Sequence, residues 1–422
     1  MTTLIFIPVL FVVGREFSMK KLLLVTLALA LVMSLAPVSF AAEEEIVIGA
    51  LYPRSGSLSL LGEESWRGAE IARIVRNQKG GINGKKIVFA NADGSDVAAA
   101  RSEAERLIEQ KKVGLILGSY SSSRSMAATE VAARKNLPYF ELGAIANAIT
   151  ERGYPTVYRT NSTAAGFSQG QVDFIIDYLA PALGKKPKDI KVSVAHEDSD
   201  YGTSVADSFK KLAAKAGLQV ISVEPYTATS SDLSPVIFRL KKADPDVIVA
   251  VSYAQDAILL GRQAAEYKLQ KPFIGTGGGH SLQSFQKALG DKANGVFNID
   301  FTQYEVNTKF TPGLKEFLEL YRKTYKEEPR SGHSLTNFMG ANVVFDIVEK
   351  AGGKFDPDKI RAAAMAVDIP LGKTANGWGV KFNDKGQNTR ASAFVTQWRD
   401  GKLLTVFPKG AAVTEPVLPS KK

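Results

Sequence analysis

The stretch LILGSYSSSRSMAATE, Leu115 to Glu130, contains the transition that decides the fold. An apolar run typical of a buried strand ends at Gly118, four serines lie within the next five residues, and an alanine-rich pattern typical of a helix follows. Three explanations compete: a catalytic serine on a strand-to-helix turn, a flexible serine linker, or a helix N-terminus that binds an anion. The rest of the sequence decides between them.

The same change from strand to helix recurs along the chain. Short runs rich in Val, Ile and Leu alternate with amphipathic helical patterns, and the runs are IVIGALY, KIVFANA, VGLILGS, LPYFELG, IKVSVAH, DVIVAVS and KPFIGTG. This alternation is typical of α/β proteins, in which helices cover both faces of parallel sheets. About 380 residues remain after the leader, which is enough for two lobes because domains typically contain ~100–200 residues.

Residues 1–41 are predicted to be a secretory signal peptide. Two lysines precede the apolar run Leu22–Met33, and small residues follow at Ser39 and Ala41. This is the pattern of an export signal that is cleaved near Ala41. The apolar run is short for a membrane span and is soon followed by a proline.

The natural start is predicted at Met19, which makes residues 1–18 a start-site error. The alternative is a membrane anchor that uses both apolar runs.

The chain contains no cysteine, so neither disulfides nor a lipidated cysteine is available and stability must come from the core. We therefore expect a periplasmic location.

The charge balance favours anionic small molecules over nucleic acid. The chain has 53 Lys and Arg against 43 Asp and Glu, a net charge of +10 at pH 7. A moderate positive excess attracts anionic solutes. No basic run is interleaved with aromatic residues, so nucleic acid is not expected as a partner.

The motifs required for catalysis are incomplete. A nucleophile elbow needs Gly-x-Ser-x-Gly, and the residues around Ser121 lack both glycines. The three histidines include no close pair, so neither a catalytic triad nor a zinc site is indicated. Residues 371–374 and 275–280 resemble nucleotide-binding loops, but each lacks a required glycine. We expect no enzyme activity, no metal and no cofactor.

The explanation that remains for the serines is a helix N-terminus that binds an anion, because its N–H groups and dipole favour negative charge. Ser121 and Ser122 would then be helix caps or ligand donors. Other strand ends carry similar small residues and isolated tyrosines, in YPRSGSLSLLG, LGAIANAIT, HEDSDYGTS, VSYAQDA and GTGGGHS. Such loops meet at a cleft between two sheets.

The order of the motifs resembles the periplasmic solute-binding proteins of ABC importers, of the branched-chain amino acid (leucine-binding protein-like) type, from Ile46 to about Leu404. The matching segments are YPRSGSLSLLGEESWRGAEIA, GGINGKKI, the serine loop, ITERGYPTVYRT, DSDYGTSVADSFK and VKFNDKGQ. The resemblance implies an α/β fold with two Rossmann-like lobes, which are joined by a three-segment hinge and close on a small-molecule solute. It also implies a membrane-embedded ABC permease as partner, and we expect a monomer.

The predicted lobes each combine two parts of the chain. Lobe I comprises residues 42–159 and 300–376, and lobe II comprises residues 160–299 and 377–410. Residues 411–422 are predicted to be a loose tail. Near the end of lobe II, two antiparallel strands are expected to be joined through residues 384–386.

The resemblance also implies the ligand-binding residues. Ser122 and the backbone near Gly143 would hold the α-carboxylate and the ammonium group of an amino acid, and Tyr201 and Tyr253 would close from the other lobe. The candidate site also includes residues beside these loops and residues that offer ring surface for stacking, namely Ser121, Ala144, Tyr120 and Trp66. For Trp66, packing of its helix against the sheet is the competing explanation.

Two positions depart from the amino acid binders. Ile145 replaces a threonine, and Gly277 replaces an acid that would accept the ammonium group. Burying an unpaired charge costs several kcal/mol, so a carboxylate with an uncharged body fits better: an aromatic or aliphatic acid, or a related amide. Glu141 or Asp200 could supply the acid instead. Branched-chain or other neutral amino acids are the alternative ligands, and a sensor lobe or an exported hydrolase is the alternative class of protein.

Overall fold

The structure is a computed structural model that describes residues 45–419. The predicted signal peptide and its cleavage site lie outside these residues. Among the described residues, no helix is long and apolar enough to cross a membrane.

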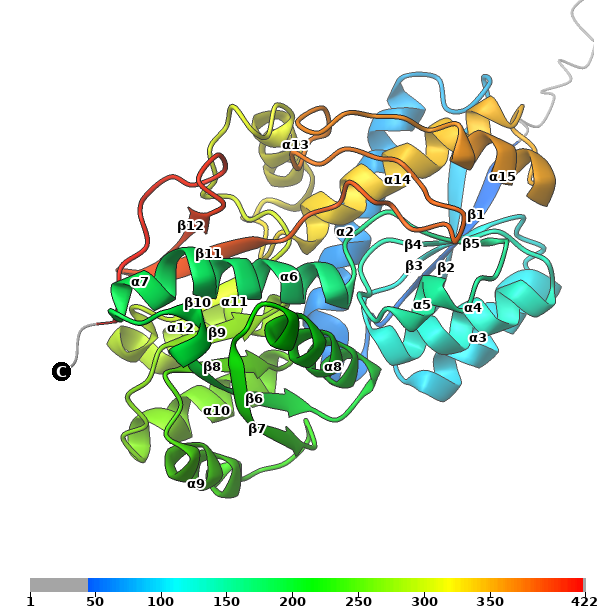
Figure 1. Ribbon diagram of the computed structural model, residues 1–422. Coiled ribbons are helices and arrows are strands. Elements are labelled where there is room, and N and C mark those ends of the chain that lie inside the picture. The colour runs from blue at the N-terminus through cyan, green and yellow to red at the C-terminus, as the bar shows by residue number, and fades with distance from the viewer. Residues whose placement is uncertain (1–44, 420–422) are drawn as a thin grey trace, which may run out of the picture. The chain divides into compact units, whose positions relative to one another are not determined.

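The described strands form two sheets (Figure 1). The five-stranded sheet of the first lobe is parallel and has the order β2 (Ile87–Asp93), β1 (Ile46–Tyr52), β3 (Ile116–Gly118), β4 (Tyr139–Glu141) and β5 (Val157–Arg159). The seven-stranded sheet of the second lobe has the order β12 (Lys402–Phe407), β11 (Phe394–Arg399), β10 (Phe297–Asp300), β9 (Phe273–Thr276), β8 (Val247–Val251), β6 (Lys191–Glu197) and β7 (Gln219–Tyr226). Only the pairs that involve β11 are antiparallel.

Helices follow most of the strands. Those that follow strands of the first sheet are α2 (Ser59–Gln78), α3 (Val97–Glu109), α4 (Ser122–Arg134) and α5 (Ala148–Glu151). The middle of the chain contributes α6 (Ala164–Phe174), α7 (Ala180–Ala182), α8 (Asp200–Lys215), α9 (Ser234–Ala243), α10 (Ala254–Glu266), α11 (Gly278–Ser281) and α12 (Gln283–Leu289). After β10 come α13 (Leu314–Tyr325), α14 (His333–Lys350) and α15 (Pro357–Met365).

Strand β8 shows why the apolar runs form buried strands. All of its residues are buried, and alternate side chains enter different hydrophobic clusters. Val247, Val249 and Val251 pack toward α6 and α8, whereas Ile248 and Ala250 pack toward α9 and α10. Because successive side chains point to opposite faces, a strand covered on both faces must be apolar throughout.

Helix α14 packs closely against α2, although α14 comes after β10 in the chain. A Cβ atom on Gly68 of α2 would lie 1.9 Å from the carbonyl oxygen of Ser334, so only glycine allows this approach. Arg76 of α2 also forms ion pairs with Asp346 and Glu349 of α14, at 2.8 and 2.7 Å. The helices after β10 therefore return to the first lobe.

The chain crosses between the two lobes at three described segments: after β5, after β10, and in residues 366–393 between α15 and β11. These segments lie side by side. The backbone N–H of Asn388 donates to the carbonyl of Arg159 at 2.9 Å, and the Thr302 hydroxyl donates to the carbonyl of Asn376 at 2.8 Å. They form the hinge, while the numbered limits of the lobes stay a prediction.

The expected strand pair near the C-terminus is displaced along the sequence. Residues 384–386 lie in a turn that is flanked by only one antiparallel bridge, between Phe382 and Asn388. The hairpin of β11 and β12 instead turns at Asp400 and Gly401, with φ of 47° and 78°. Positive φ at both central residues defines a tight hairpin turn for which Asp-Gly is a preferred sequence.

The prediction of a loose tail is wrong for residues 411–419. Ala411 is fully buried and accepts a hydrogen bond from the backbone of Asn307 at 3.0 Å. Val417 bonds to the Gln397 side chain of β11. These bonds tie the segment to the edge of the second sheet.

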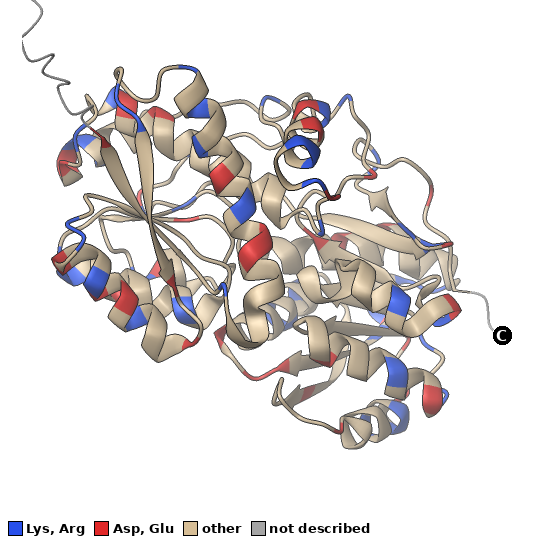
Figure 2. Ribbon diagram, turned by 180° about the vertical axis from the view of Figure 1, so that it is seen from behind, with Lys and Arg blue, Asp and Glu red and all other residues tan. Residues whose placement is uncertain are grey.

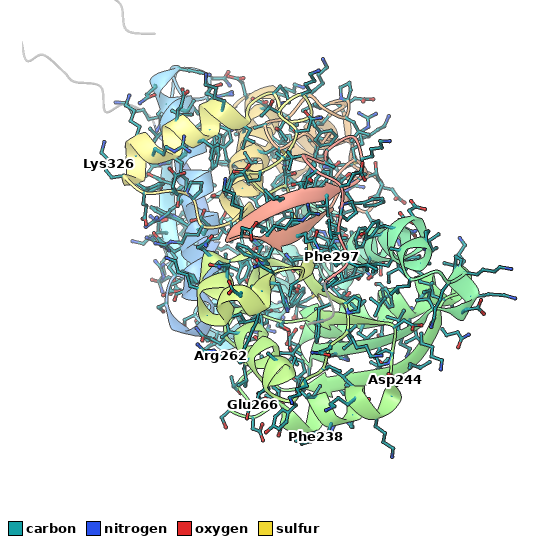
Figure 3. All side chains as sticks on the ribbon, turned by 90° about the vertical axis from the view of Figure 1, so that its left-hand side faces the viewer. Phe238, Asp244, Arg262, Glu266, Phe297 and Lys326 are labelled. Atoms are coloured by element: carbon teal, nitrogen blue, oxygen red, sulfur yellow. The ribbon has the colours of Figure 1, made fainter. Side chains whose placement is uncertain are left out.

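The outer surface carries charges of both signs. Figure 2 shows acidic and basic residues interspersed along the outer helices of both lobes. In Figure 3, Phe238 lies on the outer side of α9, where its ring packs on Tyr267 with the centroids 4.8 Å apart. Phe297 of β10, by contrast, is fully buried within the sheet.

Candidate functional site

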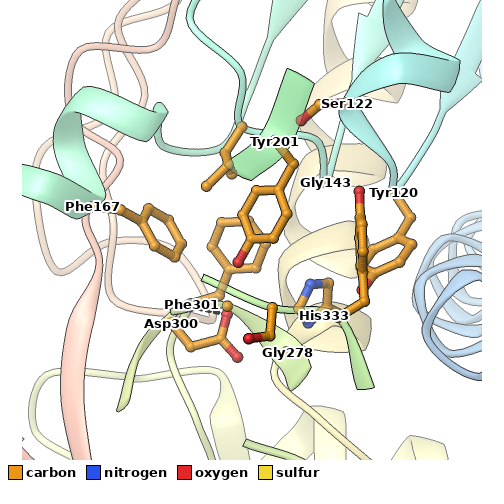
Figure 4. Close-up of a pocket in the computed structure, with 13 residues that line it drawn as sticks. Tyr120, Ser122, Gly143, Phe167, Tyr201, Gly278, Asp300, Phe301 and His333 are labelled. Carbon is orange, nitrogen blue, oxygen red and sulfur yellow. Dashed lines mark hydrogen bonds between the residues drawn. The ribbon is translucent and has the colours of Figure 1, made fainter. Parts of the chain in front are cut away.

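A cavity lies between the two lobes; we call it the inner cavity (Figure 4). Its walls come from segments that follow the carboxyl ends of strands in both sheets, as expected for ligand sites of open α/β sheets. The first lobe contributes Tyr120, Ser122, Gly143, Ile145 and His333, and the second contributes Phe167, Tyr201, Ser252, Tyr253, Gly277, Gly278, Asp300 and Phe301.

The N-terminus of α4 reaches the inner cavity without a side-chain cap. Ser121 stands at the capping position with an extended backbone, yet its side chain forms no capping hydrogen bond. Ser122 Oγ accepts a hydrogen bond from the backbone N–H of Ala146 at 3.1 Å. Since a hydroxyl carries one hydrogen of its own, Ser122 keeps a donor for a ligand. The dipole of this 13-residue helix favours an anion there.

Glu141 organises the two loops that carry Ser122 and Gly143. Its carboxylate is fully buried and accepts the backbone N–H groups of Ser119, Gly143 and Ala144 at 2.8, 2.8 and 2.7 Å. Burial raises the pKa of Glu141, and these donors oppose the rise. Because Glu141 is absent from the cavity lining and is used by the loops, it does not supply the acid missing at position 277.

Arg159 connects the same loops to the hinge. Its fully buried guanidinium donates to the carbonyl of Ala146 at 2.7 Å and to the side chain of Gln387, in the third hinge segment, at 2.6 Å. Burial lowers the pKa of Arg159 to about 10. Arg159 thus links Ala146, whose backbone N–H donates to Ser122, to the third hinge segment.

The structure explains why position 277 carries no side chain. Gly277 has a φ of +69°, and a Cβ atom there would lie 2.5 Å from the hydroxyl oxygen of Tyr201. That hydroxyl donates to the carbonyl of Thr276 at 2.7 Å. An acidic residue at 277 would therefore be strained and would displace Tyr201.

An acid lies on the neighbouring strand instead. Ile299 of β10 pairs with Thr276 of β9, so Asp300 lies beside Gly277. Asp300 is fully buried and accepts hydrogen bonds from the Ser281 hydroxyl at 2.7 Å and the Phe301 backbone at 2.8 Å. Burial raises its pKa to about 7.

Aromatic rings from both lobes form the side walls. Tyr120 lies edge-on to Tyr253 of the second lobe, with centroids 6.2 Å apart, and to His333, at 5.2 Å. Phe301 meets the other side of His333 at 5.0 Å. Burial lowers the pKa of His333 to about 3, so its ring is neutral at physiological pH.

The lobes are in contact through helix α8 of the second lobe. The backbone and side chain of Asn147 donate to Ser204 and Ser208 of α8 at 3.0 and 2.8 Å. The backbone of Asp200 donates to Ser123 of α4 at 3.4 Å. The cavity is therefore enclosed by lobes in a closed arrangement, and Asp200 lies at the lobe contact instead of in the cavity lining.

Comparisons with known proteins agree with this geometry. Residues 45–402 match the model of a family described as periplasmic binding protein. The chain belongs to this family. Leu/Ile/Val-binding protein homolog 7 of Brucella suis biovar 1 (strain 1330) is 46% identical over 404 residues, which cover 95% of this chain and 100% of that protein.

Solved periplasmic binding proteins share the fold. The branched-chain amino acid transporter substrate binding protein LivJ from Streptococcus pneumoniae, in complex with isoleucine, superposes with a TM-score of 0.72 at 24% identity, covering 88% of this chain and 100% of that one. An ABC transporter solute binding protein from R. palustris, in complex with benzoate, has a TM-score of 0.73 at 19% identity, covering 90% and 100%. Proteins of this family are periplasmic and bind small solutes for ABC importers.

Most residues that the sequence predicted for the ligand site of this family line the inner cavity: Tyr120, Ser122, Gly143, Ile145, Tyr201, Tyr253 and Gly277. Three do not. Ser121 lines a neighbouring outer pocket, and Ala144 takes part in the loop bonded to Glu141. Trp66 donates to Asn91 at 2.7 Å and stacks under Arg54, so it packs within the first lobe.

The remaining lining residues were not predicted from the sequence: Phe167, Ser252, Gly278, Asp300, Phe301 and His333. Asp300 is the last residue of the strand FNID and its one acidic residue. An acid at the end of a strand was the feature of the sequence that could have indicated a site residue. No feature of the sequence indicated His333, because this residue reaches the cavity only through the packing of α14.

Proposed function

We propose that this protein is the substrate-binding component of an ABC importer and captures a small monocarboxylate with an aromatic or aliphatic body. The observation that carries the proposal is the uncapped N-terminus of α4, where Ser122 keeps a hydroxyl hydrogen beside the inner cavity. A carboxylate at this point receives a charge-assisted hydrogen bond and the favourable helix dipole.

The surroundings of Ser122 disfavour an α-amino acid. The ammonium group of such a ligand is attached next to its carboxylate, so its acceptor must also lie near Ser122. Two lining positions in that part of the cavity, Ile145 and Gly143, offer no polar side chain, and the nearby carboxylate of Glu141 is occupied by the loops. An ammonium group buried without a partner costs several kcal/mol.

The walls of the cavity suit a small apolar body. Tyr120, Tyr253 and Phe301 offer ring faces and edges to an aromatic ring or a short chain. Branched-chain amino acids are the second candidate, supported by the name of the Brucella relative and by the isoleucine complex, whereas the benzoate complex supports the first.

We also propose that the mature protein acts as a monomer, delivers its solute to a membrane-embedded permease and catalyses no reaction. The described hydrogen bonds support the last point. Ser122 bonds to a backbone N–H, and the one histidine of the cavity lining, His333, bonds to Ser331 at 2.9 Å. A serine nucleophile needs a general base within hydrogen-bond reach, and the described partner of Ser122 is the backbone N–H of Ala146.

A thermal-shift panel of matched pairs tests the ligand class. Leucine is compared with isocaproate, valine with isovalerate and phenylalanine with hydrocinnamate, so each pair differs only in the α-amino group. A ligand at 100 times its Kd stabilises the protein by about 2.7 kcal/mol, which gives a clear rise in Tm. We expect larger rises with the acids that lack the amino group; larger rises with the amino acids would overturn the proposal.

A further inference from the structure

Asp300 is a buried acid at the end of the inner cavity opposite Ser122. Figure 4 shows Ser122 at one end and Asp300 at the other, with the ring of Tyr201 between them. Ser122 belongs to the first lobe and Asp300 to the second, so closure brings them to the same cavity. The intervening walls include Ile145, Phe167 and other apolar groups.

We propose that Asp300 accepts a hydrogen bond from a hydroxyl or amino group at the end of the ligand opposite its carboxylate. The inference rests on the proposed function, in which Ser122 binds that carboxylate. The substrate class would then be small acids with a donor at the far end, such as para-substituted benzoates.

The hydrogen bonds of Asp300 leave room for one more donor. A carboxylate has about four acceptor positions. The described donors are the Ser281 hydroxyl at 2.7 Å, the Phe301 backbone at 2.8 Å and the Gln303 amide at 3.1 Å. Among the described residues, no lysine or arginine forms an ion pair with Asp300, so its charge has no cationic partner that a ligand would have to displace.

The neighbouring polar group of the cavity is not available as this fourth donor. The hydroxyl of Tyr201 donates to the Thr276 carbonyl at 2.7 Å. The remaining acceptor position of Asp300 is therefore open to a ligand. A buried acceptor that a ligand must pair discriminates strongly between ligands with and without the matching donor.

The ionisation of Asp300 provides a second line of evidence. Burial raises its pKa to about 7, whereas it lowers the pKa of His333 to about 3 and that of His280 to about 4. The tyrosines that interact with Asp300, which are Tyr120, Tyr201 and Tyr304, have raised pKa values. Asp300 is thus the titrating group of the inner cavity near neutral pH.

Titration calorimetry with three acids tests the inference. Benzoate lacks a second donor, para-hydroxybenzoate adds a hydroxyl, and para-(aminomethyl)benzoate adds an ammonium group. A hydrogen bond to a charged acceptor changes affinity by about 10- to 150-fold, so we expect at least one substituted acid to bind that much more tightly than benzoate. The substituted acid that binds more tightly shows whether the donor is a hydroxyl or an ammonium group.

Two variants assign the effect to Asp300. Asp300→Asn should reduce the advantage of the preferred acid by about tenfold or more and change benzoate binding little. Asp256→Asn is the matched control: Asp256 is also buried with a pKa of about 7, but it lines the outer pocket and not the inner cavity. The control should keep the advantage.

The pH dependence of the wild-type protein gives a readout that needs no variant. Ionised Asp300 is the better acceptor, so the advantage over benzoate should grow from about pH 5.5 to about pH 8. Equal binding of all three acids at every pH overturns the inference and leaves the proposed function intact. An advantage that Asp300→Asn preserves also overturns it. If no carboxylate binds, the proposed function fails as well.

Discussion

Replacing Ser122 by alanine separates ligand binding from loop structure. The hydroxyl has two roles: it accepts the backbone N–H of Ala146 at 3.1 Å, and it keeps a hydrogen for the ligand. Loss of the first role leaves a buried N–H unpaired, which lowers the unliganded free energy of unfolding by about 1 kcal/mol. Loss of the second removes a hydrogen bond to a charged group, ~1.5–3 kcal/mol, and weakens binding by about 10- to 150-fold.

Neighbouring serines provide matched controls for this experiment. Ser121 makes no capping hydrogen bond, and its side chain pairs with Tyr253 of the second lobe, so Ser121→Ala should weaken binding only slightly and without loss of a ligand donor. Ser123→Ala removes only the long hydrogen bond at 3.4 Å from the backbone of Asp200 across the lobes, so affinity should fall less than about threefold. Calorimetry gives the affinity and thermal unfolding the stability. Lowered stability with unchanged affinity in Ser122→Ala would refute the placement of the carboxylate.

Two further predictions concern the second lobe. Tyr201→Phe should lower the unliganded free energy of unfolding by about 1 kcal/mol in thermal melts, because Tyr201 bonds to Thr276 within its own lobe; an unchanged Tm would show that the bond is absent in the open form. The pKa of Asp300 is raised from 3.8 to about 7, so the folded state binds more protons than the unfolded state in this window and stability falls as pH rises through it. Between about pH 5 and pH 8 this decline is at most about 2.5 kcal/mol, from about two pKa units at 1.36 kcal/mol each. Asp300→Asn should flatten it when Tm is compared at the two pH values. An equally steep decline in the variant would assign it to other groups such as Asp256.

The strands and helices were predictable because their patterns are local. The alternate packing of Val247 to Val251 on two faces requires an uninterrupted apolar run, and such a run is visible in the sequence. The hairpin at Asp400 and Gly401 also had a local signal, but residues 384–386 had a similar one. Only the pairing of β11 with β10 decides between the two turns.

The loop residues of the candidate site were predictable from the sequence, whereas the position of Asp300 beside Gly277 was not. Ser122, Gly143 and Tyr201 follow strands and were found through their position and the resemblance to a family. Asp300 could not be placed, because its presence beside Gly277 depends on the order of strands in the sheet, which is a tertiary property. The reason for glycine at position 277 is likewise tertiary, since it is the hydroxyl of Tyr201 that excludes a side chain.

The most direct test of the account is the ratio of the dissociation constants of leucine and isocaproate, measured by titration calorimetry on the mature protein. The two ligands have the same carboxylate and the same branched body, and they differ in the α-amino group. We expect tighter binding of isocaproate, by about tenfold or more, because the ammonium group of leucine would be buried beside Ile145 and Gly143 without an acceptor. Tighter binding of leucine would contradict it.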